Sequence, residues 1–164
     1  SRTQLESAIT LAYDTYGTVV DSNSKLVWKR YRSTQASIDG IVPVTSGDSI
    51  VNAVVAVSNY LGADFNAVSY MEQGHTAVET FDNISGVHGI SLTGITYEKA
   101  LSYVGDGSPV IARIGEDEYI IITAYNSSEI AYIEASTGAQ KTVSMNEAGK
   151  MFSQGGNIYV TYYK

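Results

Sequence analysis

The spacing of apolar residues changes near Gly105, and this change limits the folds open to the chain. Before it, the segments 3–17, 46–62 and 96–105 repeat apolar residues every three or four positions, as amphipathic helices do. After it come four strand-like apolar runs separated by the turn sequences GED, NSS and STG. Helices followed by strands predict an α+β domain with helices packed on one side of an antiparallel sheet.

Signals at the ends of these segments refine the prediction. A Ser or Thr followed three residues later by Glu marks a helix start at Thr3, Thr76 and Ser144, which adds short helices over 75–86 and 145–152. A last strand is expected at the end of the chain. The five strands expected after Gly105 cover residues 108–114, 118–125, 129–135, 140–145 and 157–163.

The N-terminal part reads as a helix followed by a hairpin. Two strand-like runs flank the turn sequence Asp21–Ser24, and Trp28 is expected to pack inward. Residues 31–46 show no clear period and are expected to be a loop with one short element. We expect one domain over 1–164, with the helix and hairpin in 1–45 and the core in 46–164. Because the sequence starts on a helix cap and shows no signal pattern, we expect it to be an excised part of a longer protein.

Charge and cysteine content exclude several functions. The net charge of -7 argues against a nucleic-acid partner, since such binding needs clustered Lys and Arg, and the basic stretch 25–32 is better explained as a solvated hairpin. The chain has 0 cysteines, so it has no disulfide, thiolate metal site or thiol nucleophile. No apolar run approaches the roughly 20 residues that a membrane span needs.

Metal and cofactor motifs are absent from the sequence. His75 and His88 lack the partners of a zinc motif and are expected to be surface or packing residues, with His88 between glycine-flanked turns. The acidic stretch Gly115–Glu118 lacks the oxygen spacing of a calcium loop and is expected to be a hairpin tip. With no glycine-rich phosphate loop either, we expect no cofactor and no metal.

The segment 46–62 ends in Asn59-Tyr60-Leu61-Gly62, and this end resembles the catalytic helix of a known family. The family is the double-glycine leader peptidases of bacteriocin exporters and their stand-alone bacterial relatives, a branch of the papain-like cysteine peptidases. Its helix reads Cys-Gly-Pro-Ala, an apolar run, then Asn-Tyr-Tyr/Leu-Gly. Counting back places Ser49 at the cysteine position.

The second half carries the rest of the resemblance, which spans about residues 46–164. The sequences GSPVIARI, EYIIITAYN and YIEASTG resemble, in order, the family's Gly-x-Pro-Val-Ile strand, its His-led strand and its Asp-Pro turn. The resemblance therefore places the base position at Glu118 and the orienting acid at Ala135, beside Glu134. It implies a papain-like fold.

Ser49, Glu118 and Ala135 cannot perform papain-type catalysis, which needs a thiolate, an imidazole and an acceptor that orients it. The family's oxyanion-hole Gln has no counterpart in 43–48 either. The resemblance thus implies no catalytic residues and an inactive relative, with Ser49 or Asp48 capping its helix. Whether Ser49 is natural or an engineered replacement of Cys stays open.

We therefore expect a binding or scaffolding module that takes a peptide or protein in the former cleft. The 13 tyrosines of the chain favour a contact surface, because Tyr offers area at little entropic cost. We expect the domain to sit beside neighbouring domains in a larger bacterial envelope or secreted protein, and we favour the outside or cell surface of a Gram-positive bacterium.

Two alternatives stay open. The first is a peptidase or other hydrolase with a relocated site around Ser49 and Glu118, although a carboxylate is a poor base for a serine hydroxyl. The second is a purely structural domain that packs against its neighbours in a longer chain.

Overall fold

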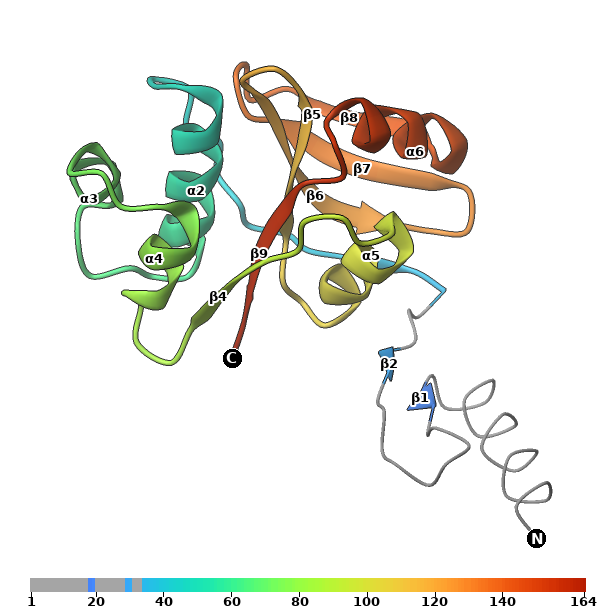
Figure 1. Cartoon of the computed structure of the whole chain (residues 1–164), viewed down its shortest axis with the longest axis horizontal. Coiled ribbons are helices and arrows are strands. Elements are labelled where there is room, and N and C mark those ends of the chain that lie inside the picture. The colour runs from blue at the N-terminus through green and yellow to red at the C-terminus, as the bar shows by residue number, and fades with distance from the viewer. Residues whose placement is uncertain (1–17, 20–28, 31–33) are drawn as a thin grey trace, which may run out of the picture.

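The computed structural model describes residues 18–19, 29–30 and 34–164 (Figure 1). Strands β1 (Thr18–Val19) and β2 (Lys29–Arg30) pair in antiparallel fashion, with Thr18 opposite Arg30, as the predicted hairpin requires. The helix expected over 3–17, the turn of that hairpin and Trp28 lie outside the described residues.

The core of the protein contains a mixed set of helices and strands in residues 34–164. None of the helices described there is long and apolar enough to cross a bilayer. The helices are α2 (Ser49–Tyr60), α3 (Ala67–Glu72), α4 (Ala77–Asp82), α5 (Tyr97–Gly105) and α6 (Met145–Gln154). The strands are β3 (Ala36–Ser37), β4 (His88–Ser91), β5 (Val110–Gly115), β6 (Glu118–Tyr125), β7 (Glu129–Glu134), β8 (Gln140–Ser144) and β9 (Tyr159–Tyr163).

These strands form one antiparallel sheet in the order β4-β9-β5-β6-β7-β8, with β3 also paired to β6. The consecutive strands β5 to β8 are the meander that the turn sequences predict. The last strand, β9, lies between β4 and β5, so the end of the chain is held inside the sheet. At the centre, Ile121 of β6 pairs with Ile111 on one side and Ile133 on the other.

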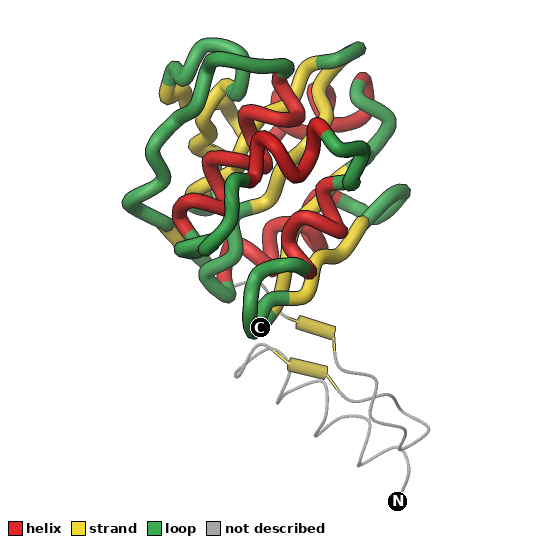
Figure 2. Tube along the Cα trace, turned by 90° about the vertical axis from the view of Figure 1, so that its left-hand side faces the viewer, coloured by secondary structure: helices red, strands yellow, loops and turns green. Residues whose placement is uncertain are grey.

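Helices cover both faces of this sheet (Figures 1 and 2). Helices α5 and α6 enclose one apolar cluster, in which Leu101 joins Ile120 of β6. Helices α2 and α4 enclose the other, in which Val54 joins Ile121. The α+β class and the antiparallel sheet are confirmed, but the packing of helices on one side only is not. Successive residues of a strand face opposite sides, so the unbroken Ile run of β6 requires a cover on each face.

Two elements, α3 and β4, are absent from the sequence-based prediction. Helix α3 is only six residues long and begins at Asn66, whose side chain accepts a hydrogen bond from the Ser69 N–H. Strand β4 contains His88, which the sequence places between glycine-flanked turns, and it forms by pairing along β9. In β4, a Cβ on Gly89 would lie 2.9 Å from the Val78 Cα, so only glycine lets the strand pass α4 this closely.

Candidate functional site

Ser49 is the first residue of α2, at the end of the helix that meets the sheet. Asp48 holds the N-cap position through its extended backbone, and its carbonyl accepts the first helical bond, from the Asn52 N–H at 2.8 Å. The Asp48 side chain makes no capping hydrogen bond. Neither side chain therefore caps the helix, and the Ser49 hydroxyl points to a different partner.

That partner is the backbone of Tyr119, the second residue of β6. The Ser49 Oγ accepts a hydrogen bond from the Tyr119 N–H at 2.8 Å and lies 3.4 Å from the Tyr119 carbonyl oxygen. Only 8% of Ser49 is exposed, so this contact is largely shielded from water. The hydroxyl at the expected nucleophile position joins α2 to the start of β6.

This bond satisfies a backbone group of β6 that has no hydrogen-bond partner in β7. Strand β7 ends at Glu134, and the Ala135 N–H still donates to the Tyr119 carbonyl at 3.1 Å. The reciprocal groups, the Tyr119 N–H and the Ala135 carbonyl, bond to α2 instead. Ser49 takes the N–H, and the Asn52 Nδ2 donates to the Ala135 carbonyl at 3.0 Å. Residues three apart share one helix face, so Ser49 and Asn52 complete the ladder together.

Asn52 also fixes the loop that enters the helix. Its Nδ2 donates to the Gly47 carbonyl and its Oδ1 accepts from the Gly47 N–H, both at 2.8 Å. Asn52 is 1% exposed, and both the oxygen and the nitrogen of its side-chain amide have hydrogen-bond partners within the protein. We call Gly47, Ser49, Asn52, Tyr119 and Ala135 the Ser49 network. The sequence offered one signal for Asn52: it is a polar residue in the apolar run after Ser49.

The structure brings two of the three positions expected from the resemblance into this network. Ser49 and Ala135 meet around the Tyr119 peptide, whereas the Glu118 carboxylate takes no part in these bonds. Strand alternation places exposed Glu118 on the same face as Ile120, under α5 and α6, while Tyr119 packs on the cluster of α2.

Glu134, the other carboxylate near Ala135, is engaged elsewhere. It accepts hydrogen bonds from the Lys141 Nζ at 2.7 Å and the Thr137 Oγ1 at 2.8 Å. These two bonds hold the pKa of Glu134 below its usual value. The carboxylate therefore ties β7 to β8 and to the turn between them.

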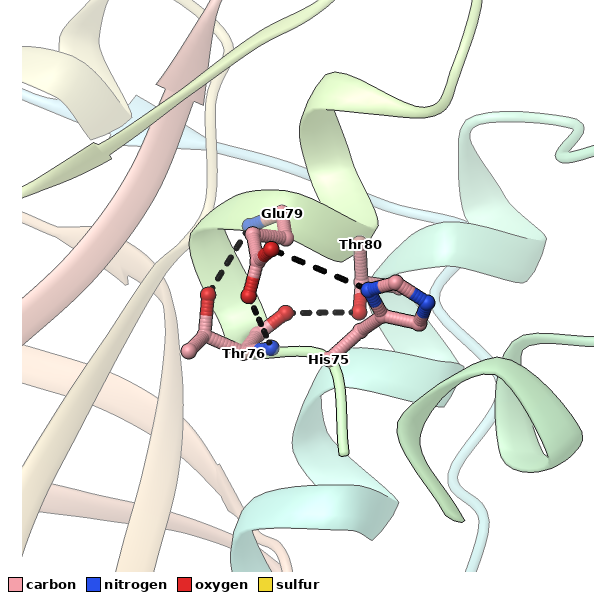
Figure 3. A network of polar contacts seen from close by, with 4 residues as sticks. All are labelled: His75, Thr76, Glu79 and Thr80. Carbon is pink, nitrogen blue, oxygen red and sulfur yellow. Dashed lines mark hydrogen bonds and ion pairs between the residues drawn. The ribbon is translucent and has the colours of Figure 1, made fainter. Parts of the chain in front are cut away.

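Each histidine has local partners away from the Ser49 network. His75 stacks on Tyr70, with ring centroids 3.8 Å apart, and its Nδ1 lies 3.7 Å from the Glu79 carboxylate. Figure 3 shows that Glu79 also closes the capping box with Thr76 at the start of α4, as predicted. Bonds from Thr76 hold the pKa of Glu79 below its usual value. His88 stacks on Tyr163 across β4 and β9.

The arrangement offers no constellation for metal chemistry in the part of the chain that the structure describes, where no three His, Asp or Glu side chains gather. What it offers is a helix N-terminus held on the edge of a sheet by side-chain bonds to backbone groups. An N-terminus of α2 that is held in this way is suited to forming part of a rigid surface.

Comparison with known proteins identifies the fold. No family model matches the sequence, and no curated protein matches it. Among solved structures, a Bacillus anthracis protein described as a C39-like peptidase matches with a TM-score of 0.63 at 12% sequence identity. The match covers 80% of this chain and 98% of that one. The chain therefore has a C39-like, papain-like fold, as the sequence resemblance implies.

Proposed function

We propose that the protein is a catalytically inactive papain-like domain that binds a peptide or protein partner, within a larger bacterial envelope or secreted protein. The observation that carries the proposal is the bond between the Ser49 Oγ and the Tyr119 N–H, 2.8 Å long. It gives the residue at the nucleophile position a structural task.

Proton transfer from Ser49 lacks a suitable acceptor. A serine nucleophile needs a base within hydrogen-bond reach, and that base is usually oriented by a third group. The Ser49 hydroxyl faces a peptide group, Glu118 belongs to the other face of β6, and Ala135 has no polar side chain. These contacts support a loss of hydrolysis rather than a new catalytic pair.

The surface around Ser49 is well suited to binding. The loop before α2 is exposed at residues 45–48, and the hairpin tip 116–118 is exposed beside it along β6. The turn after β7 supports the loop, because a Cβ on Gly138 would lie 3.1 Å from Pro43 and 3.2 Å from Thr45. A partner would meet a rim that is already ordered, which lowers the entropic cost of binding.

The inactivity is tested with a fluorophosphonate probe, which labels activated serine hydroxyls. We expect intact-protein mass spectrometry to show no adduct on the wild-type protein or on Ser49→Ala. The variant Ser49→Cys, treated with iodoacetamide, tests whether a thiol at this position is activated, and we expect ordinary slow alkylation. A fluorophosphonate adduct that maps to Ser49 and disappears in Ser49→Ala would establish the hydrolase alternative.

The binding role needs a separate experiment. We expect an array of random peptides to identify ligands, and the charge reversal Asp48→Lys to weaken their binding about tenfold or more. Asp64→Lys changes an equally exposed carboxylate outside this rim and serves as the matched control. If the peptides bind Asp48→Lys as they bind wild type and Asp64→Lys, the former cleft is not the binding surface.

A further inference from the structure

A pocket of about 520 Å³ lies where the ends of α2, α5 and β9 meet. Its wall carries Tyr60, Tyr103, Tyr162 and Tyr163, and we call it the tyrosine pocket. Its volume is within the range of small-molecule sites. Tyr60 is the last residue of α2 and Ser49 the first, so at 1.5 Å per residue the pocket lies roughly 17 Å from the Ser49 network.

Two of its aromatic rings are open to solvent. Tyr163 is 49% exposed and Tyr60 is 38% exposed, and in residues 34–164 the only other large apolar side chain so exposed is Val42. Single exposed apolar residues are ordinary, but two that share a concave site indicate binding. His88 stacks on Tyr163 with ring centroids 5.1 Å apart, which holds that ring as a fixed platform.

The other two tyrosines supply polar groups at the base of the pocket. Tyr162 is buried, and Ser108 lines the pocket beside it. Burial, with Asp106 and Tyr163 nearby, raises the pKa of Tyr103. The Tyr103 phenol is protonated at neutral pH and offers a hydroxyl group that a polar ligand can use.

The charges of the lining are balanced. Among its side chains, the pocket wall holds one carboxylate, Asp106, and one ammonium group, Lys164, although the chain as a whole has a net charge of -7. The ammonium group would repel a cation and the carboxylate would repel an anion, whereas neither group repels a neutral ligand.

We propose that the tyrosine pocket binds a neutral saccharide. A pyranose ring has an apolar face of C–H groups that packs on a tyrosine ring, as Tyr60 and Tyr163 permit. Its hydroxyl groups both donate and accept hydrogen bonds, so they match a lining with a carboxylate, an ammonium group and phenols. Stacking on exposed rings in an open pocket gives weak binding, in the millimolar range.

This site is separate from the proposed peptide surface, which lies at the opposite end of α2. A protein that holds a saccharide at one end of the helix and a peptide at the other would join two components of an envelope. Each role has its own residues, so the failure of one experiment leaves the other proposal standing.

The test is an NMR titration of the full chain with cellobiose, maltose and N,N′-diacetylchitobiose. We expect at least one sugar to cause saturable shifts confined to residues of the tyrosine pocket. Tyr163→Ala and Tyr60→Ala should each weaken binding about tenfold, while Tyr163→Phe, which keeps the ring, should retain most of it. Both residues are substantially exposed, so the variants should fold, which thermal unfolding checks.

Tyr70→Ala provides the matched control, because Tyr70 lies on α3 outside the pocket. It should bind the sugars as wild type does. Tetramethylammonium and benzoate serve as small charged probes, and tighter binding of either at the pocket would overturn the proposal. It is equally refuted if none of the three sugars binds up to its solubility limit, or if their shifts map to residues 43–48.

Discussion

Asn52→Ala should lower the free energy of unfolding, because it removes the hydrogen bonds that Asn52 makes in the Ser49 network. The Asn52 amide makes three hydrogen bonds, two with Gly47 and one with the Ala135 carbonyl. Alanine removes all three and leaves their partners in place. The two kinds of partner differ in their access to water, and that difference decides the magnitude.

Ala135 is 2% exposed, so its carbonyl would remain buried without its Asn52 partner, at a cost of about 1–3 kcal/mol. Gly47 is exposed, so water can replace its two bonds, and their loss costs about 1 kcal/mol at most. Alanine recovers about 0.5 kcal/mol through its higher helix propensity. The net loss is about 2 kcal/mol, which lowers Tm by roughly 4–8 °C for a domain of this size.

Urea denaturation followed by circular dichroism measures this loss, with Asn59→Ala as the matched control. Asn59 lies on the same helix with an exposed side chain, so alanine there should gain about 0.5 kcal/mol. We expect the two variants to differ by about 2.5 kcal/mol. If they agree within about 0.5 kcal/mol, the network does not hold α2 on the sheet and the reasoning fails.

Three further predictions concern other parts of the fold. Gly155→Ala should destabilise by about 1–3 kcal/mol in urea, because the added Cβ would run into the Arg113 carbonyl although the φ of -80° suits alanine. Ser58→Ala should leave stability unchanged or raise it by up to about 1 kcal/mol; the hydroxyl is fully buried and has no hydrogen-bond partner among the described residues, and a measured loss would show that one exists. Burial raises the pKa of both Tyr159 and Tyr162 to about 12, so the unfolded chain loses these protons first and stability should fall between pH 10 and about 12. Alkaline titration of Tm checks this fall, and Tyr162→Phe should flatten it; an unchanged slope would contradict the assignment.

The regular elements were largely predictable because their signals are local. The run 118–125 is the whole of β6, and Thr96 marks the start of α5 through a side chain that accepts from the Lys99 N–H. Helix α3 and strand β4 were missed for the same reason. A six-residue helix has too few turns to show a period, and the four residues His88–Ser91 form a strand only because β9 lies alongside.

The candidate site was predictable only in part. The family resemblance located Ser49 and Ala135, which the structure brings together through Tyr119. It did not reveal the role of Asn52 or of the Tyr119 peptide. A backbone group carries no mark in a sequence, and the bond from Asn52 to Ala135 spans residues far apart in the chain.

The sequence by itself determined the α+β class, the order of most elements and the absence of a cysteine nucleophile, because each depends on residue type and short-range spacing. Only the tertiary structure decided that helices cover both faces of the sheet and that Ser49 completes a ladder bond. Both depend on which apolar faces and backbone groups are left without a partner when strands distant in sequence pair. Those groups are defined only in the folded chain.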